Sequence, residues 1–432
     1  MKTLLLSFLH TLTRAVVKKY RPIVIAITGS VGKTATKEAV YAVIATKQRA
    51  RRSRGNYNTE IGLPLTILAI DWAPGRSPIK WFAVFLRAFG LLVKTQTYPE
   101  VLVLEMGTDK PGDIAELLRI VTPTIGVITA ISLVHTEQLG DLAGVAREKG
   151  SMFRAIGREG TIMVNQDDPE VVKIAEFSHS QRISYSAKQS EGVDVYASEI
   201  SISRSESSET GIQGMSFKIQ TKGTVTPVLI NDSLGEHWVY PALVAAAVSQ
   251  ALGLHMVDVA EGLRNFKPEP GRMRVLLGIK HTTIIDDTYN ASPASMAAAL
   301  ETVTKLSSKG TTFAVLGDML ELGALSEEEH KKIGRIVAKL PLDVVLITVG
   351  ERSRDIARGA RAAGKEEERV FEFGNVQEAG LFVQNRMEKG DVVLVKGSRG
   401  MHMEKIVKEI MAEPLRAKEL LVRQSAEWLR KA

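Results

Sequence analysis

A glycine-rich loop between an apolar run and a helical segment constrains the fold of this 432-residue chain more than any other feature. Residues 23–27 read IVIAI, and residues 28–34 read TGSVGKT. This order predicts a strand, a loop and a helix whose backbone amides face the phosphates of a nucleoside triphosphate. Ile27 occupies the place of the first glycine of the full Walker pattern, so a plain glycine turn is the alternative interpretation.

The residue types in this loop suit the parts of a nucleotide bound with Mg²⁺. We assign Gly29, Ser30 and Gly32 to the phosphate cradle. Lys33 is expected to reach the β- and γ-phosphate oxygens, and Thr34 to help hold Mg²⁺ through its hydroxyl.

Composition narrows the class of protein. The length suits two or three domains, and 44% hydrophobic with 24% charged residues is typical of a globular protein. The chain has no cysteine, which excludes disulfides, cysteine–zinc sites, iron–sulfur clusters and thiol catalysis. We expect a monomer in the cytoplasm.

Charge is concentrated near the N-terminus. Residues 1–54 hold twelve Lys or Arg and one acid, Glu38, in a chain of net charge +7. This asymmetry indicates an anionic partner. The basic run at 47–54 lacks aromatic residues on which bases could stack, so we expect no nucleic acid. The run is either a solvated strand edge near the nucleotide or a contact for a substrate phosphate.

Two basic segments show helical apolar spacing. In residues 3–17 the stripe is Leu5, Leu9, Leu12 and Val16. In residues 79–94 aromatic and aliphatic positions follow the same spacing, while Lys80, Arg87 and Lys94 recur every seven residues. Both segments are too short to span a bilayer. They either contact the anionic inner leaflet peripherally or pack on the nucleotide-binding domain.

Alternating strand and helix patterns predict an α/β protein. We expect strands at 22–28, 100–105, 124–129, 161–164 and 181–185, antiparallel hairpins in 193–231, and a helical pair at 238–252 and 256–264. Further strands are expected at 283–287, 312–316, 343–349, 370–373 and 391–395. The domains are then a basic amphipathic helix (1–21), a central P-loop ATPase domain with a mostly parallel sheet and a small antiparallel portion (22–268), and a Rossmann-like doubly wound domain (269–432).

Further motifs follow the loop in a fixed order. They are NTEIGLPLT at 58–66, LEMG at 104–107, SLVH at 132–135, AREKG at 146–150, GR at 271–272, DDTYN at 286–290, LGDMLELG at 316–323 and VKGSR at 395–399. In this order and spacing, the set resembles the Mur ligase family over about residues 22–411. Within that family the motifs most resemble the members that add D-alanyl-D-alanine.

The resemblance implies an ATP-dependent, ADP-forming amide ligase of peptidoglycan precursor synthesis. Its substrates would be a muramoyl-peptide carboxylate and D-alanyl-D-alanine, joined through an acyl phosphate. In such phosphoryl transfers the protein mainly positions groups and offsets charge.

The resemblance also implies two Mg²⁺ ions. Glu105, at the end of an expected strand, would bind one of them, although a turn carboxylate is the alternative. His135 and a carbamylated Lys149 would hold the second. Ser151 stands where the family has a glutamate, two residues after this lysine.

The family's remaining site residues are carried over from the later motifs. Arg272, Asp287, Tyr289 and Asn290 would meet the nucleotide, and Arg272 also joins Lys33, Glu105, His135 and Lys149 in the expected catalytic set. Asn58 and Thr59 are assigned to substrate. So are Asp318, Glu321, Lys396 and Ser398, for which turn chemistry is an equal alternative. Ser292 and Pro241 replace asparagines of the family, which leaves the adenine contacts open.

One departure from the family affects the expected substrate. The family carries an N-terminal domain for the uridine nucleotide, whereas about 21 residues precede the first expected strand. A related ligase acting on another, lipid-linked envelope precursor is therefore an alternative. A nucleotide-binding protein that regulates or scaffolds without ligating is the second alternative.

Overall fold

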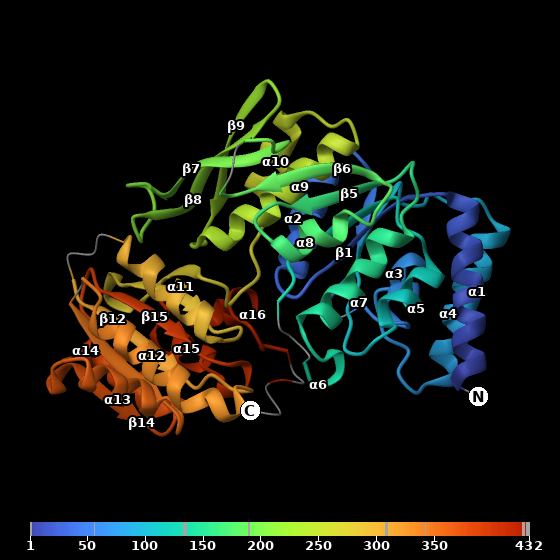
Figure 1. Ribbon diagram of the computed structural model, residues 1–432. Helices are drawn as coiled ribbons and strands as arrows, with labels where there is room; N and C mark the ends of the chain where they lie inside the picture. The colour runs from blue at the N-terminus through green and yellow to red at the C-terminus, as the bar shows by residue number, and fades with distance from the viewer. Residues whose placement is uncertain are drawn as a thin grey trace. The chain divides into compact units, whose positions relative to one another are not determined.

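The computed structural model describes residues 2–55, 57–132, 136–188, 191–306, 310–341, 343–425 and 428. These residues divide into two compact units (Figure 1). Unit 1 comprises residues 1–200, 217–229 and 236–266, and unit 2 comprises 201–216, 230–235 and 267–432.

A nine-stranded sheet, β2-β3-β1-β4-β5-β6-β7-β8-β9 in spatial order, contains the first predicted strands. From β2 to β7 each pair of neighbours is parallel. The run of βαβ patterns in the sequence correctly predicted this arrangement. The parallel strands before the hairpin are β1 (Ile23–Thr28), β2 (Ala50–Arg52), β3 (Val101–Glu105), β4 (Ile125–Ile128), β5 (Thr161–Asn165) and β6 (Gln181–Ser186).

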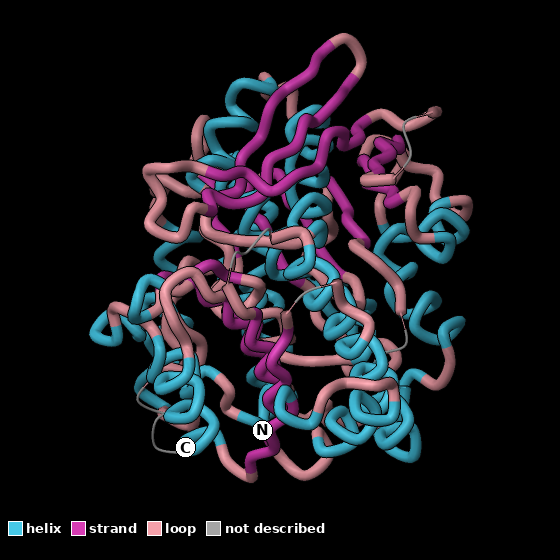
Figure 2. Tube along the Cα trace, turned by 90° about the vertical axis from the view of Figure 1, so that its left-hand side faces the viewer, coloured by secondary structure: helices cyan, strands magenta, loops and turns pink. Residues whose placement is uncertain are grey.

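The predicted antiparallel portion is also present. Strands β7 (Val195–Arg204), β8 (Ile212–Thr221) and β9 (Thr224–Asn231) follow one another in the sheet. A two-residue turn joins β8 to β9, which form the long hairpin at the top of Figure 2. Alternate residues of β8 are buried, as expected of a strand with one solvated face.

Helices of unit 1 bury the loop-bearing strand β1. On one side, Val24 and Ala26 pack with apolar residues of α5 (Asp113–Ile120), α7 (Leu142–Ala155) and α8 (Pro169–Ala175). Helix α2 (Lys33–Ile44) packs on α9 (Val239–Ala251) and α10 (Met256–Asn265). α9 is largely apolar and is buried throughout residues 241–249, and the predicted helical pair is confirmed. The short helix α6 (Thr136–Leu139) precedes α7.

A second, smaller core of unit 1 is formed by α1 (Lys2–Tyr20), α3 (Gly62–Ile67) and α4 (Pro78–Val93). Leu9, Leu12 and Val16 of α1 are buried in it. The leucine stripe of residues 3–17 thus packs on unit 1, which was the second of the two alternatives for this segment. Among the described residues, no helix is both long and apolar enough to cross a membrane.

Unit 2 contains a six-stranded sheet in the order β10-β11-β15-β12-β13-β14. Its strands β11 (Thr283–Asp287), β12 (Thr312–Gly317), β13 (Val344–Val349), β14 (Val370–Phe373) and β15 (Val392–Lys396) are parallel and match the five predicted ones. The edge strand β10 (Arg274–Leu277) runs antiparallel to β11 and was not predicted.

Helices complete the doubly wound architecture of unit 2. They are α11 (Pro293–Thr304), α12 (Ser326–Ala338), α13 (Arg354–Ala362), α14 (Val376–Arg386), α15 (Glu404–Ile410) and α16 (Ala417–Leu420). Short 3₁₀ helices in the chain are Glu236–Trp238, Ile279–His281, Gly323–Leu325, Glu367–Arg369, Arg399–Met401 and Pro414–Arg416. The carboxyl ends of the parallel strands lie along the same edge of such a sheet, so the side chains that follow these strands are close together.

Candidate active site

The loop between β1 and α2 requires glycine at two positions. Gly29 has φ 148°, and a Cβ atom there would lie 2.0 Å from Thr129 Oγ1. Gly32 has φ 81° and directly precedes the first residue of α2. No other residue type adopts such backbone without strain, so the loop closes tightly at the N-terminus of α2. Exposed amides at a helix start favour an anion, as the sequence predicted for this loop.

Contacts with the end of β4 hold the loop in this shape. The Ser30 amide donates to the Ala130 carbonyl at 2.8 Å. The Ser30 hydroxyl donates to the Ser132 carbonyl at 3.0 Å and accepts from the Ser132 amide at 2.9 Å. Thr129 Oγ1 donates to the Val31 carbonyl at 2.5 Å. Ser30, predicted to contact phosphate, therefore has its side chain engaged in bracing the loop.

Lys33 and Thr34 begin helix α2 directly after the loop. The Lys33 ammonium group donates to the carbonyls of Gly29 at 2.7 Å and Ser30 at 3.4 Å. It thus lies across the mouth of the cradle, where it offsets the charge of the loop carbonyls. Both side chains are half-buried.

Glu105 ends β3, the strand that pairs with β1, and its Cα partner there is Ile27. Its side chain is only 3% exposed. Oε1 accepts from Asn58 Nδ2 at 3.3 Å, while Oε2, within the described ranges, accepts no hydrogen bond. A buried carboxylate oxygen without such a partner suits a cation, because oxygen ligands are what Mg²⁺ prefers.

Lys37 is a residue of this site that our reading of the sequence missed. It is fully buried one turn after Lys33, and its Nζ lies 3.4 Å from Glu105 Oε2 and 3.3 Å from Glu38 Oε1. A lysine four residues after the loop lysine shares its helix face, which is the signal that could have revealed it. Lys37 pairs with the Glu105 carboxylate and holds it in place.

Replacing Lys37 with methionine should destabilise unit 1 strongly. The change leaves Glu105 buried without a cation, and breaking one side of a buried pair costs about 3 kcal/mol. The free energy of unfolding is measured in denaturant by tryptophan fluorescence, since Trp238 is buried in this unit. The double variant Lys37→Met/Glu105→Gln should lose less, because no unpaired charge remains. Lys47→Met, at an exposed ion pair, is the control. Equal losses in the single and double variants would contradict the pairing.

Lys149 lies on α7 and is 1% exposed. The pKa of Lys149 is lowered to about 8, chiefly by burial and then by the positive charge of Lys33, against the opposing effects of Glu148 and Asp109. Glu148 itself accepts from the amides of Gly112 and Ile114 at the start of α5. A buried amine with a lowered pKa is partly neutral near pH 7, which makes it nucleophilic.

The second predicted metal ligand, His135, lies outside the described residues. Within the described part of the chain, no three His, Asp or Glu side chains form a metal cluster. The Ser151 hydroxyl, where the family has a glutamate, donates to the Glu148 backbone carbonyl on its own helix at 2.5 Å. The Ser151 hydroxyl is therefore used in a hydrogen bond within helix α7.

Asn58 and Thr59 lie beside β3, before helix α3. Asn58 contacts Glu105, and its backbone carbonyl accepts from the Gly107 amide at 3.0 Å. Thr59 is exposed, and its hydroxyl accepts weakly from the Gly62 amide at 3.4 Å. Of the two, Asn58 is thus the one that contacts the Glu105 carboxylate.

In unit 2, four predicted residues meet at the ends of β11 and β15. Asp287 and Lys396 are partners in the sheet register, and Lys396 Nζ lies 2.6 Å from Asp287 Oδ2. Lys396 also donates to the Asn290 carbonyl at 3.0 Å, and the Asn290 side chain accepts from the Arg399 amide at 3.2 Å. Ser398 follows two residues after Lys396.

Arg272 and Tyr289 form a stacked pair in unit 2. The Arg272 guanidinium lies 3.9 Å from the Tyr289 ring centroid and forms an ion pair with Glu269 at 3.1 Å. The Tyr289 amide donates to the Gly271 carbonyl at 2.9 Å, which holds the two segments together. A planar cation on a partly exposed ring is a surface suited to phosphate and to flat ligands.

The remaining predicted substrate residues of unit 2 have structural contacts. Asp318 Oδ1 accepts from the Ser353 amide at 2.7 Å, and Ser398 Oγ accepts from the Leu320 amide at 2.8 Å. Glu321 is exposed and has φ 65°. Ser292, which replaces a family asparagine, caps α11 in a capping box, and Pro241 is buried in α9. Turn chemistry accounts for the contacts of Asp318 and Ser398.

The basic run at 47–54 has a role in the fold. It includes the edge strand β2, as one of the two alternatives expected. Each of its five cations has an acidic partner, at distances from 2.6 to 3.4 Å, namely Lys47–Asp258, Arg49–Glu100, Arg51–Asp71, Arg52–Glu38 and Arg54–Asp71. Because these charges are paired within unit 1, the structure favours the strand edge over a phosphate contact.

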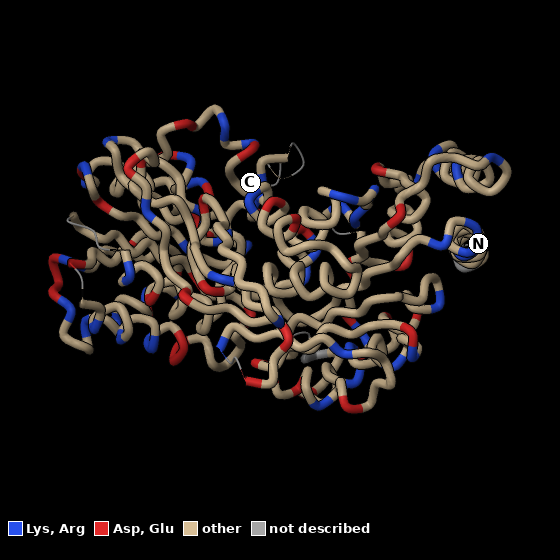
Figure 3. The backbone as a smooth tube through the Cα atoms, turned by 90° about the horizontal axis from the view of Figure 1, so that it is seen from above, with Lys and Arg blue, Asp and Glu red and all other residues tan. Residues whose placement is uncertain are grey.

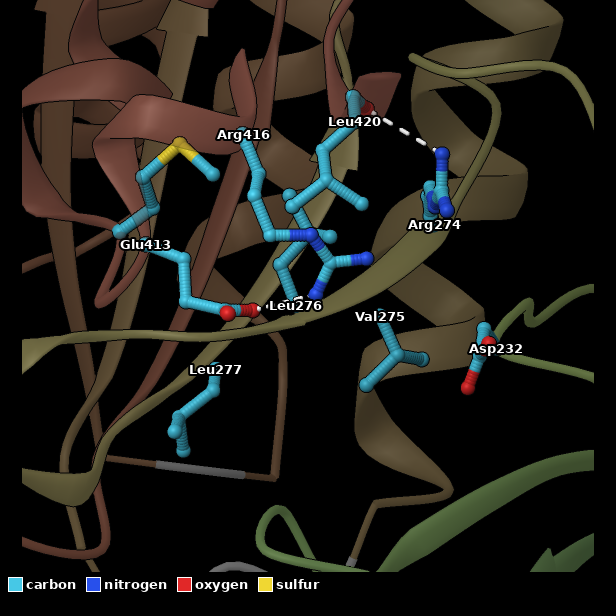
Figure 4. Close-up of a pocket in the computed structure, with 9 residues that line it drawn as sticks. Asp232, Arg274, Val275, Leu276, Leu277, Glu413, Arg416 and Leu420 are labelled. Carbon is cyan, nitrogen blue, oxygen red and sulfur yellow. Dashed lines mark hydrogen bonds and ion pairs between the residues drawn. The ribbon is translucent and has the colours of Figure 1, made fainter.

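A pocket of about 180 Å³ in unit 2 lies along β10 (Figure 4). Arg274 and Arg416 enter it together with Asp232 and Glu413. Arg416 forms an ion pair with Glu413 at 2.8 Å, so its charge is locally balanced. None of the residues predicted for the site lines this pocket.

Both units match one family of enzymes. Residues 89–249 match the Mur ligase middle domain, and residues 271–399 match the domain described as Mur ligase, glutamate ligase domain.

Named relatives and a solved structure agree with these matches. A UDP-N-acetylmuramoyl-tripeptide–D-alanyl-D-alanine ligase of Bacillus subtilis (strain 168) is 33% identical over 411 residues, 95% of this chain and 80% of that protein. The enzyme of the same name from Escherichia coli (strain K12) is 28% identical, over 90% of this chain and 76% of its own. The crystal structure of MurF from Acinetobacter baumannii superposes with TM-score 0.74 at 29% identity, covering 92% of this chain and 79% of that one. Since the similarity extends through the loop-bearing unit and the doubly wound unit alike, this chain belongs to the Mur ligase family.

Proposed function

We propose that the protein is an ATP-dependent, ADP-forming ligase that joins D-alanyl-D-alanine to the carboxylate of a muramoyl tripeptide. The observation that carries the proposal is the glycine loop closed on Thr129, with the buried Glu105 carboxylate on the neighbouring strand. It stands in a chain that aligns with 80% of a relative named for that activity.

The proposed reaction has two steps. An oxygen of the acceptor carboxylate attacks the γ-phosphorus of ATP, the bond to the β-phosphate oxygen breaks, and ADP leaves an acyl phosphate behind. The amine of D-alanyl-D-alanine then attacks the acyl carbon, loses a proton and displaces inorganic phosphate. Loop amides and Lys33 bind the phosphates and offset the negative charge of the transferring group.

The residues present fit a bound Mg²⁺. Thr34, Glu105, His135 and Lys149 are the groups that would hold one or two ions. The supporting observation is the buried Glu105 Oε2, which accepts no hydrogen bond from the described residues and lies 3.4 Å from Lys37 Nζ. Mg²⁺ would supply charge neutralisation on the phosphate oxygens. Lys37, 3.4 Å from Glu105 Oε2, would position this side chain for that role.

We assign Lys149 a carbamate. Its neutral amine would attack CO₂ and release a proton, which converts a buried cation into an oxygen anion. Burial and the lowered pKa of Lys149 favour the neutral amine that this step needs. The ammonium groups of Lys33 and Lys149 repel each other. The carbamate anion would instead be attracted to the Lys33 ammonium.

In unit 2 we assign Arg272, Tyr289, Asp287 and Asn290 to the nucleotide. The exposed stacked face of Arg272 on Tyr289 supports this role. Asp318, Glu321, Lys396 and Ser398 are assigned to the amine substrate, and Asn58 and Thr59 to the acceptor. For Lys396 the supporting observation is a buried ammonium at the end of a parallel strand.

The test is an assay of phosphate release together with the mass of the product. ATP and Mg²⁺ are combined with UDP-linked or lipid-linked muramoyl tripeptide, with and without D-alanyl-D-alanine, and D-alanine alone is the control amine. We expect phosphate and an amide product only when both substrates are present. Turnover with a lipid-linked acceptor alone would assign the related ligase activity. Nucleotide binding without an amide product from any acceptor would favour a regulatory protein and overturn the proposal.

A further inference from the structure

An apolar stripe runs along the outside of helix α4, away from the core. Ile79, Phe82, Leu86, Phe89 and Val93 are exposed, with Ile79 at 81% and Val93 at 79%. Their spacing of three and four residues places them on one side of the helix. The opposite side, with Val84, Ala88 and Leu91, is buried and holds α4 on unit 1. The exposed stripe therefore has no part in the core of this unit.

Helix α1 contributes exposed apolar residues next to this stripe. Phe8 lies with its ring centroid 5.1 Å from that of Phe85 and 6.2 Å from that of Phe89, and Leu4 is exposed one turn before it. The C-terminal ends of the two helices are tied together, because Lys19 donates to the carbonyls of Leu91, Leu92 and Lys94. α1 and α4 lie side by side in Figure 1. We call Leu4, Phe8, Ile79, Phe82, Leu86, Phe89 and Val93 the outer face.

Only cations accompany the outer face on these helices. No acid occurs before Glu38 or between Asp71 and Glu100, so α1 and α4 carry Lys and Arg alone. Lys18, Lys80 and Lys94 are exposed on these two segments. Figure 3 shows Lys and Arg in blue at the helix marked N. Paired acids balance the basic run at 47–54, whereas these helices contain no acid of their own.

We propose that the outer face of α1 and α4 docks on an anionic lipid bilayer, an inference independent of the proposed reaction. α4 has 16 residues and spans roughly 24 Å, less than a hydrocarbon core, so it would lie in the interface plane. Aromatic and aliphatic side chains would enter the acyl boundary while the lysines meet headgroup phosphates. A second copy of the chain would oppose cations to cations, which disfavours self-association through this face.

The burial of side chains in α1 and α4 changes which residues could face lipid. The spacing had suggested Leu5, Leu9, Leu12 and Val16 of α1, but the last three are buried in the core with α3 and α4. In α4 the half-buried Trp81 and Phe85 likewise face this core. The surface available to lipid consists of the outer face instead.

The test is flotation of the full chain with vesicles. We expect binding to vesicles with 30–40% phosphatidylglycerol at low salt, at least about tenfold weaker binding to phosphatidylcholine alone, and weakening in high salt. Ile79→Ser/Phe82→Ser/Leu86→Ser should lose at least about tenfold in binding while keeping its melting temperature, because the three side chains are exposed. The matched control replaces exposed apolar residues elsewhere, Val225→Ser/Val257→Ser/Leu325→Ser, and should bind like the unmodified chain.

Each contrary result has a definite meaning. Failure of the unmodified chain to bind anionic vesicles at low salt overturns the proposal, as does unchanged binding of the triple serine variant. Sedimentation that shows self-association, abolished by the same variant, would assign the face to a second copy. Because ligation is assayed separately with soluble acceptor, loss of vesicle binding leaves the test of the proposed function untouched.

Discussion

Replacing Lys33 with alanine is expected to lower kcat about a hundred- to a thousandfold. The ammonium group lies across the loop, 2.7 Å from the Gly29 carbonyl, and in the proposed reaction it offsets the charge that develops during phosphoryl transfer. Removing one such preorganised contact costs several kcal/mol in the transition state. The fold should survive, because the side chain is half-buried and bonds to loop carbonyls rather than to the core.

Phosphate release with saturating substrates measures this effect. Lys218→Ala, which removes an exposed lysine from β8, is the control and should behave like the unmodified chain. Thermal unfolding shows whether both variants are folded. A folded Lys33→Ala protein that retains a third or more of normal turnover would remove Lys33 from the catalytic set.

Replacing Lys149 with alanine should have the second large effect, a loss of at least about a hundredfold in turnover. If Lys149 carries a carbamate, the change removes an oxygen anion from the metal site, not merely a cation. Short carboxylates such as acetate or propionate should restore part of the activity, because they place an oxygen anion in the space vacated by the side chain. The unmodified chain should lose activity in CO₂-depleted buffer and regain it with bicarbonate.

The bicarbonate response separates this role from simple packing. Lys149→Ala should respond to acetate but not to bicarbonate, and Lys173→Ala, on the neighbouring helix α8, should respond like the unmodified chain. A density map of the nucleotide–Mg²⁺ complex at high resolution shows the modification directly. An unmodified Lys149 side chain in that complex, together with no acetate rescue, would refute the carbamate.

The residues of one short stretch of sequence were sufficient to predict the nucleotide loop. Gly29, Gly32 and Lys33 lie within five residues, and the geometry they form depends on backbone freedom and helix capping close in the chain. The strands that flank them were also predictable, because buried parallel strands are short continuous apolar runs. The family resemblance added residues whose roles no spacing reveals, above all Lys149.

Long-range packing decided which charged residues are buried and which pair near the surface. Lys37 and the arginines of 47–54 look alike in the sequence, yet Lys37 is buried against Glu105 while the others line an edge strand and pair with acids near the surface. Partners such as Glu105 and Asp258 are tens to hundreds of residues distant, so pairing depends on the folded chain.

The loop, most of the strands and helices and the motifs that contain the site residues could be predicted without coordinates, because they depend on short-range backbone preferences and local apolar pattern. The packing of the folded chain is what buries Leu9, Leu12 and Val16 and leaves Ile79, Phe82 and Val93 on the surface. Both stripes have the same helical period. Which one is buried depends on what the helix packs against, and for α1 and α4 that neighbour is α3 together with each other.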